Sequence, residues 1–299
     1  MDFKRHFGGI ILLAMLLGFA FPEPGFLFKP YLHALLMLLM FTSCLKIDWR
    51  EVKSYLKDTK HMLFILLIVH MLTAIIALLF RPFLSEELFL GLVIAAVAPA
   101  GLSAVYLCDV CRGKPADALA LTSMSNLLSP ATMPLLVFAF AGASVTVNAI
   151  GMVWLITKII VLPFIAAQIM NHLPGRDIIG KIGKNIAIPL VIMIILAIIA
   201  PTREQVLANL TETAILFGIV SLMILCAFFS GWFFAKERKT AITYAITSSY
   251  KNFTLSTVVA LTLFGPVVAL PSIVYTIANN VWLVPMNYFF AHAPRKASR

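Results

Sequence analysis

Long apolar runs fill almost the whole chain, and short stretches with proline, glycine and charged residues separate them. Each run is close to the roughly 20 residues that an α-helix needs to cross a bilayer, so the pattern predicts membrane-spanning helices. The fold class is therefore all-α, a polytopic membrane protein with ten transmembrane helices. The predicted spans are residues 7–22, 30–46, 61–80, 87–108, 117–141, 147–170, 185–200, 213–235, 241–264 and 269–291.

The composition supports this class. The chain of 299 residues is 61% hydrophobic and 12% charged, whereas soluble domains are about half apolar and about a quarter charged. The net charge of +10 predicts contact with anionic membrane lipid rather than with nucleic acid, because cytoplasmic loops of membrane proteins are basic. Lys4 and Arg5 precede the first run, which lacks an Ala-x-Ala cleavage site and is interpreted as a retained span.

The positions of the basic residues predict the orientation. With the N-terminus inside, 18 of the 23 Lys and Arg residues lie on the cytoplasmic side and 3 on the opposite side. The other two, Lys158 and Lys251, lie inside predicted spans. Because basic loops stay in the cytoplasm, this distribution predicts a multi-pass protein of the cell (inner) membrane with both termini cytoplasmic.

Ten spans divide into two halves of five, residues 1–143 and residues 144–299. Five is odd, so a repeated half would be inverted relative to the other, as in inverted-repeat transporters. The fourth span of each half is polar. In the first half, Pro99 and Gly101 predict a helix break between Ala98 and Ser103. Its counterpart is 247–252, without Gly or Pro, and the two stretches should cross there near mid-membrane.

Lys251 lies about ten residues inside its apolar run, roughly 15 Å along a helix, in a stretch of polar residues at 247–255. A lysine at this depth is costly unless it faces protein or water, so it predicts a functional site. The alternative is a lysine that snorkels to the surface. A polar cluster in the fifth span, which includes Thr122, Ser125 and Asn126, either lines the same site or mediates helix packing.

The acidic residues all fall in loops or at span ends, so neither Lys158 nor Lys251 has a carboxylate at its depth. An unpaired lysine in a membrane either loses its proton or binds an anion. The sequence therefore predicts a small or amphipathic organic anion as the substrate. For Lys158, bonding to backbone carbonyls or snorkelling is an equal alternative. The predicted substrate-binding residues are Ser103, Asn126, Lys158, Lys251 and Asn252.

No metal, cofactor or catalytic centre is expected. Cys108 and Cys111 form a Cys-Asp-Val-Cys pair without a second pair, which is a weak metal signal. The chain lacks a His-Glu-x-x-His motif, a Gly-x-Ser-x-Gly elbow and an intramembrane carboxylate pair, so an intramembrane enzyme is disfavoured. The leading interpretation is a secondary transporter that works by alternating access. The alternative is a non-transporting membrane sensor or scaffold that keeps the fold.

Several short stretches, in this order along almost the whole chain, resemble those of the bile acid:sodium symporter family. They are Leu39-Met40-Phe41 with Leu45-Lys46-Ile47-Asp48, Ala98-Pro99-Ala100-Gly101, Arg112-Gly113-Lys114, Lys251-Asn252-Phe253-Thr254-Leu255, Phe264-Gly265-Pro266 and Ala269-Leu270-Pro271. The resemblance implies a mobile core domain of spans three to five and eight to ten. It also implies a panel domain of spans one, two, six and seven, with the substrate in the cleft between them.

The residues that bind sodium in this family are largely replaced. According to the resemblance, the family has Ser and Asn where this chain has Ala104 and Val105, and a serine where it has Ala118. The family has a glutamate where this chain has Thr247, and glutamines where it has Lys251 and His70. The family's threonine is kept as Thr122. Sodium needs several hard oxygen ligands with carboxylate charge. We therefore expect that sodium coupling is lost or rebuilt in this chain. The predicted ion-coupling positions are His70, Thr122, Thr247 and Lys251.

Lys251 is predicted to stand in for a sodium ion as a tethered cation, so that transport is independent of sodium. Two alternatives stay open. A lysine that releases its proton during the cycle would couple transport to protons, with His70 as a relay or as a packing residue. A lysine that stays charged would make the protein a uniporter or an exchanger.

Overall fold

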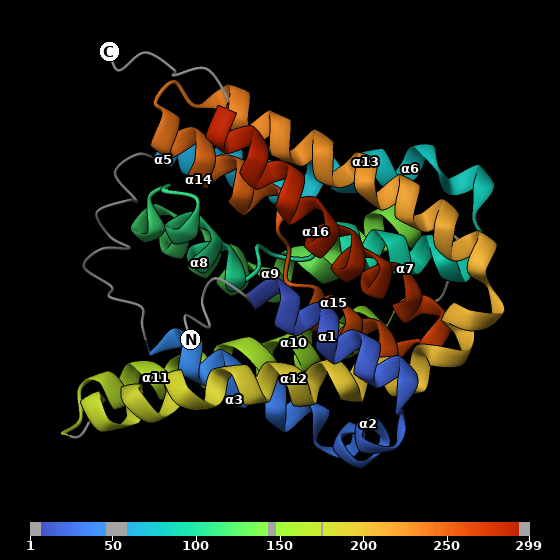
Figure 1. Cartoon of the computed structure of the whole chain (residues 1–299), viewed down its shortest axis with the longest axis horizontal. Helices are drawn as coiled ribbons and strands as arrows, with labels where there is room; N and C mark the ends of the chain where they lie inside the picture. The colour runs from blue at the N-terminus through green and yellow to red at the C-terminus, as the bar shows by residue number, and fades with distance from the viewer. Residues whose placement is uncertain (1–6, 46–58, 143–147, 175, 293–299) are drawn as a thin grey trace.

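The computed structural model describes residues 7–45, 59–142, 148–174 and 176–292, and these residues form a bundle of helices without a β-strand (Figure 1). The basic residues of the two chain ends and of the 46–58 loop, and the predicted boundary near Ala143, lie outside the described residues. The helices before that boundary are α1 Phe7–Ala20, α2 Glu23–Phe28, α3 Leu32–Cys44, α5 Thr59–Leu67, α6 Thr73–Leu79, α7 Glu86–Ala96, α8 Ser103–Val110 and α9 Pro115–Ala141.

The helices after the boundary are α10 Ala149–Ile156, α11 Leu162–Asn171, α12 Arg176–Ala208, α13 Leu210–Phe234, α14 Arg238–Ser249, α15 Phe253–Leu263 and α16 Pro266–His292. Two π-helical turns, Ile68–Leu72 and Thr157–Val161, join α5 to α6 and α10 to α11. Each of the ten predicted apolar runs falls mainly on helix. The all-α prediction is therefore confirmed.

Six of the described helical segments are long and apolar enough to cross a membrane. They are Glu23–Cys44, Pro115–Ala141, Ala149–Asn171, Asn185–Ala208, Leu210–Phe234 and Pro266–Phe290. Gly9–Ala20, Leu63–Leu79 and Phe253–Leu263 are apolar but shorter. The fourth and ninth predicted runs do not reach the required length because each is divided into two short helices.

The loop predicted after residue 200 is instead helical, because α12 continues through Pro201 to Ala208 and α13 begins at Leu210. Proline removes one backbone donor, but membrane helices tolerate it when a nearby hydroxyl bonds the local carbonyls. Here the Thr202 hydroxyl donates to the carbonyl oxygen of Ile198 at 2.9 Å and to that of Ile199 at 3.1 Å. Proline was therefore a poor guide to the end of this helix.

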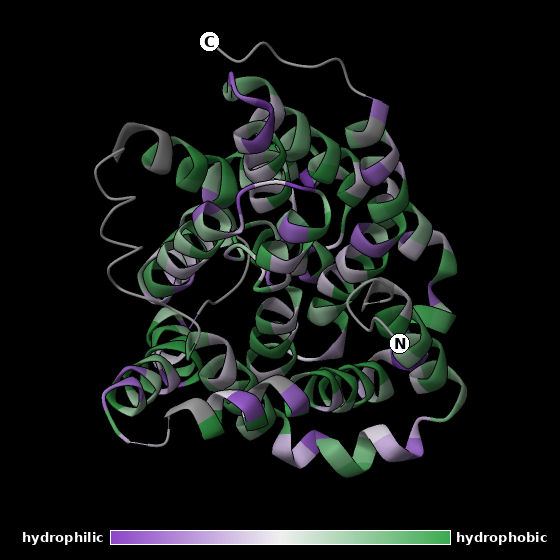
Figure 2. Cartoon of the chain, turned by 60° about the vertical axis from the view of Figure 1, so that its left-hand side comes forward, coloured by the Kyte–Doolittle hydropathy of each residue, from purple (hydrophilic) through white to green (hydrophobic). Residues whose placement is uncertain are grey.

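Hydrophobic residues occur along helices throughout the bundle (Figure 2), and many of them are exposed at its surface. Ile150 is 84% exposed and Val284 is 75% exposed, which is typical of helices that face lipid rather than water. The most enclosed elements are α7 and α14. Every residue of α7 from Leu88 onward and every residue of α14 from Ala241 onward is buried. Both helices end inside the protein, and their ends form the centre of the candidate site.

Candidate functional site

The predicted interruption of the fourth run is present. Helix α7 ends at Ala96 and α8 begins at Ser103, so the break starts slightly before the predicted Ala98. The ninth run is interrupted too, since α14 ends at Ser249 and α15 begins at Phe253. The second break forms without proline or glycine, and contacts with the first break provide its backbone partners.

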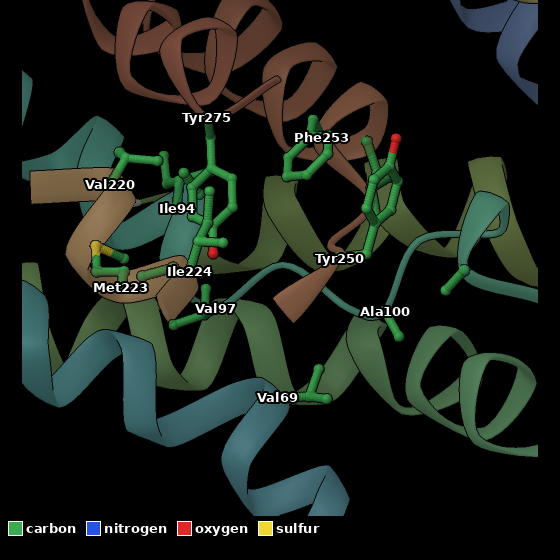
Figure 3. Packing of buried hydrophobic residues seen from close by; sticks show 14 of the residues in the cluster. Val69, Ile94, Val97, Ala100, Val220, Met223, Ile224, Tyr250, Phe253 and Tyr275 are labelled. Carbon is green, nitrogen blue, oxygen red and sulfur yellow. The ribbon is translucent and has the colours of Figure 1, made fainter. Parts of the chain in front are cut away.

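The two interrupted stretches cross and pair with each other in an antiparallel arrangement at Ala100 and Lys251. The Gly101 N–H donates to the carbonyl oxygen of Tyr250 at 2.8 Å, and the Asn252 N–H donates to that of Pro99 at 2.7 Å. Backbone groups inside a membrane must be paired within the protein, and these two bonds pair an N–H group and a carbonyl of each stretch outside the helices. Figure 3 shows Ala100 and Tyr250 on the two stretches.

Gly101 allows the two backbones to approach this closely. A Cβ atom at residue 101 would lie 2.6 Å from the carbonyl oxygen of Lys251 and 3.0 Å from its carbonyl carbon. Such contacts are shorter than van der Waals distance, so a larger residue would push the stretches apart. The glycine that predicted the break from the sequence is therefore also the residue that permits the crossing.

The Lys251 ammonium group is enclosed by backbone oxygens. The side chain is 1% exposed, and its Nζ atom donates to the carbonyl oxygens of Val69, Ala96 (2.6 Å) and Ala98 (3.3 Å). An ammonium has three donors and no acceptor, so these three oxygens match its capacity. Ala96 is the last residue of α7, where the helix dipole favours a cation.

His70 lies in the first π-helical turn and supports the same break. Its Nδ1 atom is 3.2 Å from the carbonyl oxygen of Val97, and its Nε2 atom is 3.0 Å from the hydroxyl of Ser125. The Ser125 oxygen accepts the Ala100 N–H at 3.0 Å. A carbonyl can only accept, so a neutral imidazole carries its proton on Nδ1 and accepts the Ser125 proton at Nε2. This arrangement satisfies both ring nitrogens.

Asn126 and Asn252 hold the two breaks together. The Asn126 amide donates to the carbonyl oxygens of Ala100 at 2.9 Å and Thr122 at 2.8 Å, and its oxygen accepts from the Asn252 amide at 3.1 Å. The Asn252 oxygen caps α15 by accepting the Leu255 N–H at 3.2 Å. These contacts use both amide hydrogens of Asn126, whereas one amide hydrogen of Asn252 has no partner among the described residues.

Thr122 and Thr247 are both fully buried. The Thr247 hydroxyl donates to the carbonyl oxygen of Thr243 at 2.8 Å within its own helix. The Thr122 hydroxyl has no hydrogen-bond partner among the described residues. Neither residue adds a charge to the crossing. In the described part of the chain, no group of His, Cys, Asp and Glu is arranged to hold a metal ion.

A cavity of about 80 Å³ lies beside the crossing. The two breaks form one wall, and apolar residues of α1, α3 and α12 form the opposite wall. Of the predicted substrate-binding residues, Ser103, Lys251 and Asn252 line this cavity, and Asn126 does not. The other lining residues are Ile11, Leu36, Leu39, Met40, Gly101, Leu102, Val191, Ile195, Tyr250, Phe253, Thr254, Thr276 and Asn280.

Lys158 does not join the other predicted substrate-binding residues. It lies on the exposed surface of the second π-helical turn, and its Nζ atom is 5.3 Å from the ring centre of Trp154. The turn that carries Lys158 packs against α3, which has His33 near its start. The Nε2 atom of His33 is 3.0 Å from the hydroxyl of Thr262 near the end of α15.

Sequence reasoning missed several parts of this site. The carbonyl oxygens around Lys251 left no signal, because every residue carries one. Asn280 and Thr276 left a detectable signal, since they are polar residues deep inside the last apolar run. The Asn280 oxygen is buried, has no partner among the described residues and belongs to a side chain that lines the cavity.

Buried polar helix breaks that cross inside an apolar bundle, next to a cavity, define a class of protein, the secondary membrane transporters. A model of the Sodium Bile acid symporter family matches residues 33–212. This match covers more than half of the chain, and the chain therefore belongs to that family. The family assignment supports a multi-pass membrane transporter of a small molecule.

Two curated proteins of Bacillus subtilis (strain 168) are similar over nearly their full lengths. The uncharacterized sodium-dependent transporter YocS is 24% identical over 289 residues, which are 93% of this chain and 88% of that protein. The uncharacterized protein YbaS is 20% identical over 293 residues, which are 94% of this chain and 92% of that protein.

Proposed function

We propose that this protein is a secondary carrier that moves a small or amphipathic organic anion by alternating access without sodium. The observation that carries the proposal is the buried Lys251 ammonium, bonded to three backbone oxygens where the two broken stretches cross. Carbonyl oxygens are the hard ligands that a sodium ion also prefers. A tethered ammonium in their centre holds the breaks together without a dissociable cation.

Charge supports the loss of sodium coupling. The resemblance to the family places a glutamate at Thr247 and a glutamine ligand at Lys251, and this chain has a neutral and a cationic side chain there. Sodium binding at the crossing would place a second cation near a fixed one without a carboxylate to offset it, and like charges at close range repel. We therefore infer that Lys251 provides the cation at the crossing in place of sodium.

An anionic solute fits the cavity best. Helices α8 and α15 both begin at residues that line it, Ser103 and Phe253, and helix N-termini carry partial positive charge that favours anions. The hydroxyls of Ser103 and Thr254 provide donors, and the Asn280 oxygen provides an acceptor. The expected solute therefore carries an anionic group and a hydrogen-bond donor. The apolar residues of α1, α3 and α12 would contact its hydrocarbon part.

The architecture that we propose has ten membrane spans in two inverted repeats, residues 1–143 and residues 144–299, with both termini in the cytoplasm of a cell membrane. The panel consists of the segments that contain α1, α2–α3, α10–α11 and α12. The core consists of the remaining helices. In Figure 1, α1, α3, α11 and α12 lie together along the lower side, and α13, α14 and α16 lie along the upper side. The cavity between these two groups supports a substrate cleft at their interface.

The direct test is a thermal-stability screen of the purified protein with small carboxylates, sulfonates and amphipathic acids, in sodium chloride and in potassium chloride. A ligand that binds only the folded protein raises its stability by about 2.7 kcal/mol at 100 times its dissociation constant. We expect stabilising anions with equal effects in both salts, and weaker effects in Ser103→Ala and Thr254→Val. Stabilisation only by neutral or cationic solutes, or only with sodium, would contradict the proposal.

The proposal also includes an alternative in which transport is coupled to protons. If Lys251 releases its proton during the cycle, transport depends on a pH gradient, and Lys251→Gln removes this dependence. The variant should not acquire sodium dependence, because the family's glutamate is still absent at Thr247. A Lys251→Gln carrier driven by sodium would contradict the view that the crossing lacks the remaining sodium ligands.

A further inference from the structure

Lys158 is the second lysine inside an apolar run, and its environment differs from that of Lys251. It follows the start of α10 at Ala149 by nine residues, about 14 Å along a helix. Its side chain is exposed and lies over the ring of Trp154, which is itself 62% exposed. A cation at this depth is costly unless it meets water or an anion. No carboxylate pairs with it among the described residues.

His33 and Thr262 place this lysine at a junction between helices. The π-helical turn that carries Lys158 packs against α3, and the Nε2 atom of His33 on α3 lies 3.0 Å from the Thr262 hydroxyl on α15. In the proposed architecture, α3 and the Lys158 segment belong to the panel, and α15 belongs to the core. The three side chains therefore lie where the two domains meet.

This junction is connected to the central cavity along two helices. His33 precedes the cavity residues Leu36 and Met40 by three and seven positions, so the three side chains share one face of α3. Thr262 follows the cavity residue Thr254 by eight positions on α15, about 12 Å along the helix. An anion held at the junction is thus about two helical turns from the cavity.

We propose that Lys158 and His33 form an anion-binding subsite that receives the carboxylate or sulfonate group of an incoming solute, and that the anion replaces Thr262 as the partner of His33. The subsite rests on the proposed function, because it assumes an anionic solute. Capture of the anion would break the contact between α3 and α15 and so free this end of the cleft. Trp154 would contact the solute's apolar part.

The test uses the full chain in nanodiscs of zwitterionic phosphatidylcholine, with Trp154 emission as the signal and Trp154→Phe to assign it. Taurocholate and benzoate serve as an amphipathic and a small organic anion. We expect a saturable change that becomes roughly tenfold weaker in Lys158→Gln, as for loss of a charged hydrogen bond, and that persists in Lys158→Arg. Thr262→Val should tighten binding, because it removes the competing partner of His33.

One control separates this subsite from other exposed charges. Lys29→Gln removes an exposed charge just before α3 and should leave the titration unchanged. Equal affinity in the unmodified protein and Lys158→Gln would overturn the proposal, and so would a signal that responds only to anionic phosphatidylglycerol in the disc. Failure of the proposed function would appear separately, as an absence of stabilising anions in the thermal screen.

Discussion

Lys251 illustrates how a lysine can be buried in a membrane protein without a carboxylate. Its three donors meet three carbonyl oxygens, one of which belongs to a π-helical turn and one to the end of a helix. The bonded ammonium therefore replaces its hydration shell with fixed dipoles, as an ion does in a carbonyl-lined site. Polar contacts of His70 and Asn126 surround the same break and hold those dipoles in place.

The first prediction concerns this residue. Lys251→Met keeps much of the side-chain volume but leaves the Val69 and Ala98 oxygens without their donor. Because an unpaired buried polar group costs about 1–3 kcal/mol, we expect a loss of several kcal/mol in stability and a lower melting temperature of the purified protein. Lys29→Met, at an exposed site, should melt like the unmodified protein. An unchanged melting temperature for Lys251→Met would show that the carbonyl contacts contribute little.

A second prediction follows from the Ser125 hydroxyl, which bonds both His70 and the Ala100 N–H. Ser125→Ala should destabilise the protein by about 1–3 kcal/mol, because it leaves a buried N–H and a ring nitrogen unpaired. Ser129→Ala is the matched control, since its hydroxyl bonds only a carbonyl of its own helix. Melting temperatures of the two variants make the comparison, and an equal loss in both would contradict this role of Ser125.

At the scale of elements, the close approach of the two breaks predicts the effect of a small change. Gly101→Ala places a methyl group 2.6 Å from the Lys251 carbonyl oxygen. Overpacking of this kind typically costs about 1–3 kcal/mol. Gly180→Ala on α12 has no atom within 4 Å of the added carbon and should be neutral or stabilising, because alanine favours helix. Equal melting temperatures for the two variants would contradict the tight crossing.

The loop between α8 and α9 is tied to the start of α14 outside the predicted spans. Lys114 Nζ lies 2.5 Å from Glu237 Oε2, and this hydrogen bond lowers the pKa of Glu237. A carboxyl with a lowered pKa stabilises the fold above its unfolded pKa of about 4.3, and this contribution is lost as the pH falls through the folded value.

Both side chains are partly exposed, so we expect less than about 1 kcal/mol from this pair. The melting temperature of the unmodified protein should exceed that of Glu237→Gln at pH 7, and the difference should vanish in strong acid and shrink at high salt. A difference that grows as the pH falls would contradict the assigned direction.

The sequence predicts some of these elements better than others. The first break was predictable because proline and glycine act locally on the backbone, and the depth of Lys251 marked the crossing. The partners of Lys251 were not predictable, because carbonyl oxygens are common to all residues and the fold alone selects three of them. Lys158 was grouped with Lys251 by depth, but depth does not determine which helix face a residue occupies. That face depends on tertiary packing.

For the whole molecule, the proposed alternating access predicts that α3 and α15 separate at the His33–Thr262 contact. Cysteines at these two positions, in a background without the four native cysteines, should react with a short bifunctional thiol reagent. We expect the cross-linked protein to lose transport but to keep anion-dependent thermal stabilisation. Cysteines at Gly180 and Leu210 lie about 40 Å apart along α12, too far for the reagent to bridge, and control for thiol modification without a cross-link. Full transport by the cross-linked protein would contradict movement at this contact.

The central claim is that the Lys251 ammonium takes the place of the sodium ion in this member of the Sodium Bile acid symporter family. Its most direct test is uptake of a stabilising anion into proteoliposomes, with sodium and pH gradients imposed separately. The account predicts the same uptake rate when sodium is replaced by potassium or choline on both sides of the membrane. Uptake that requires sodium in the unmodified protein would contradict it.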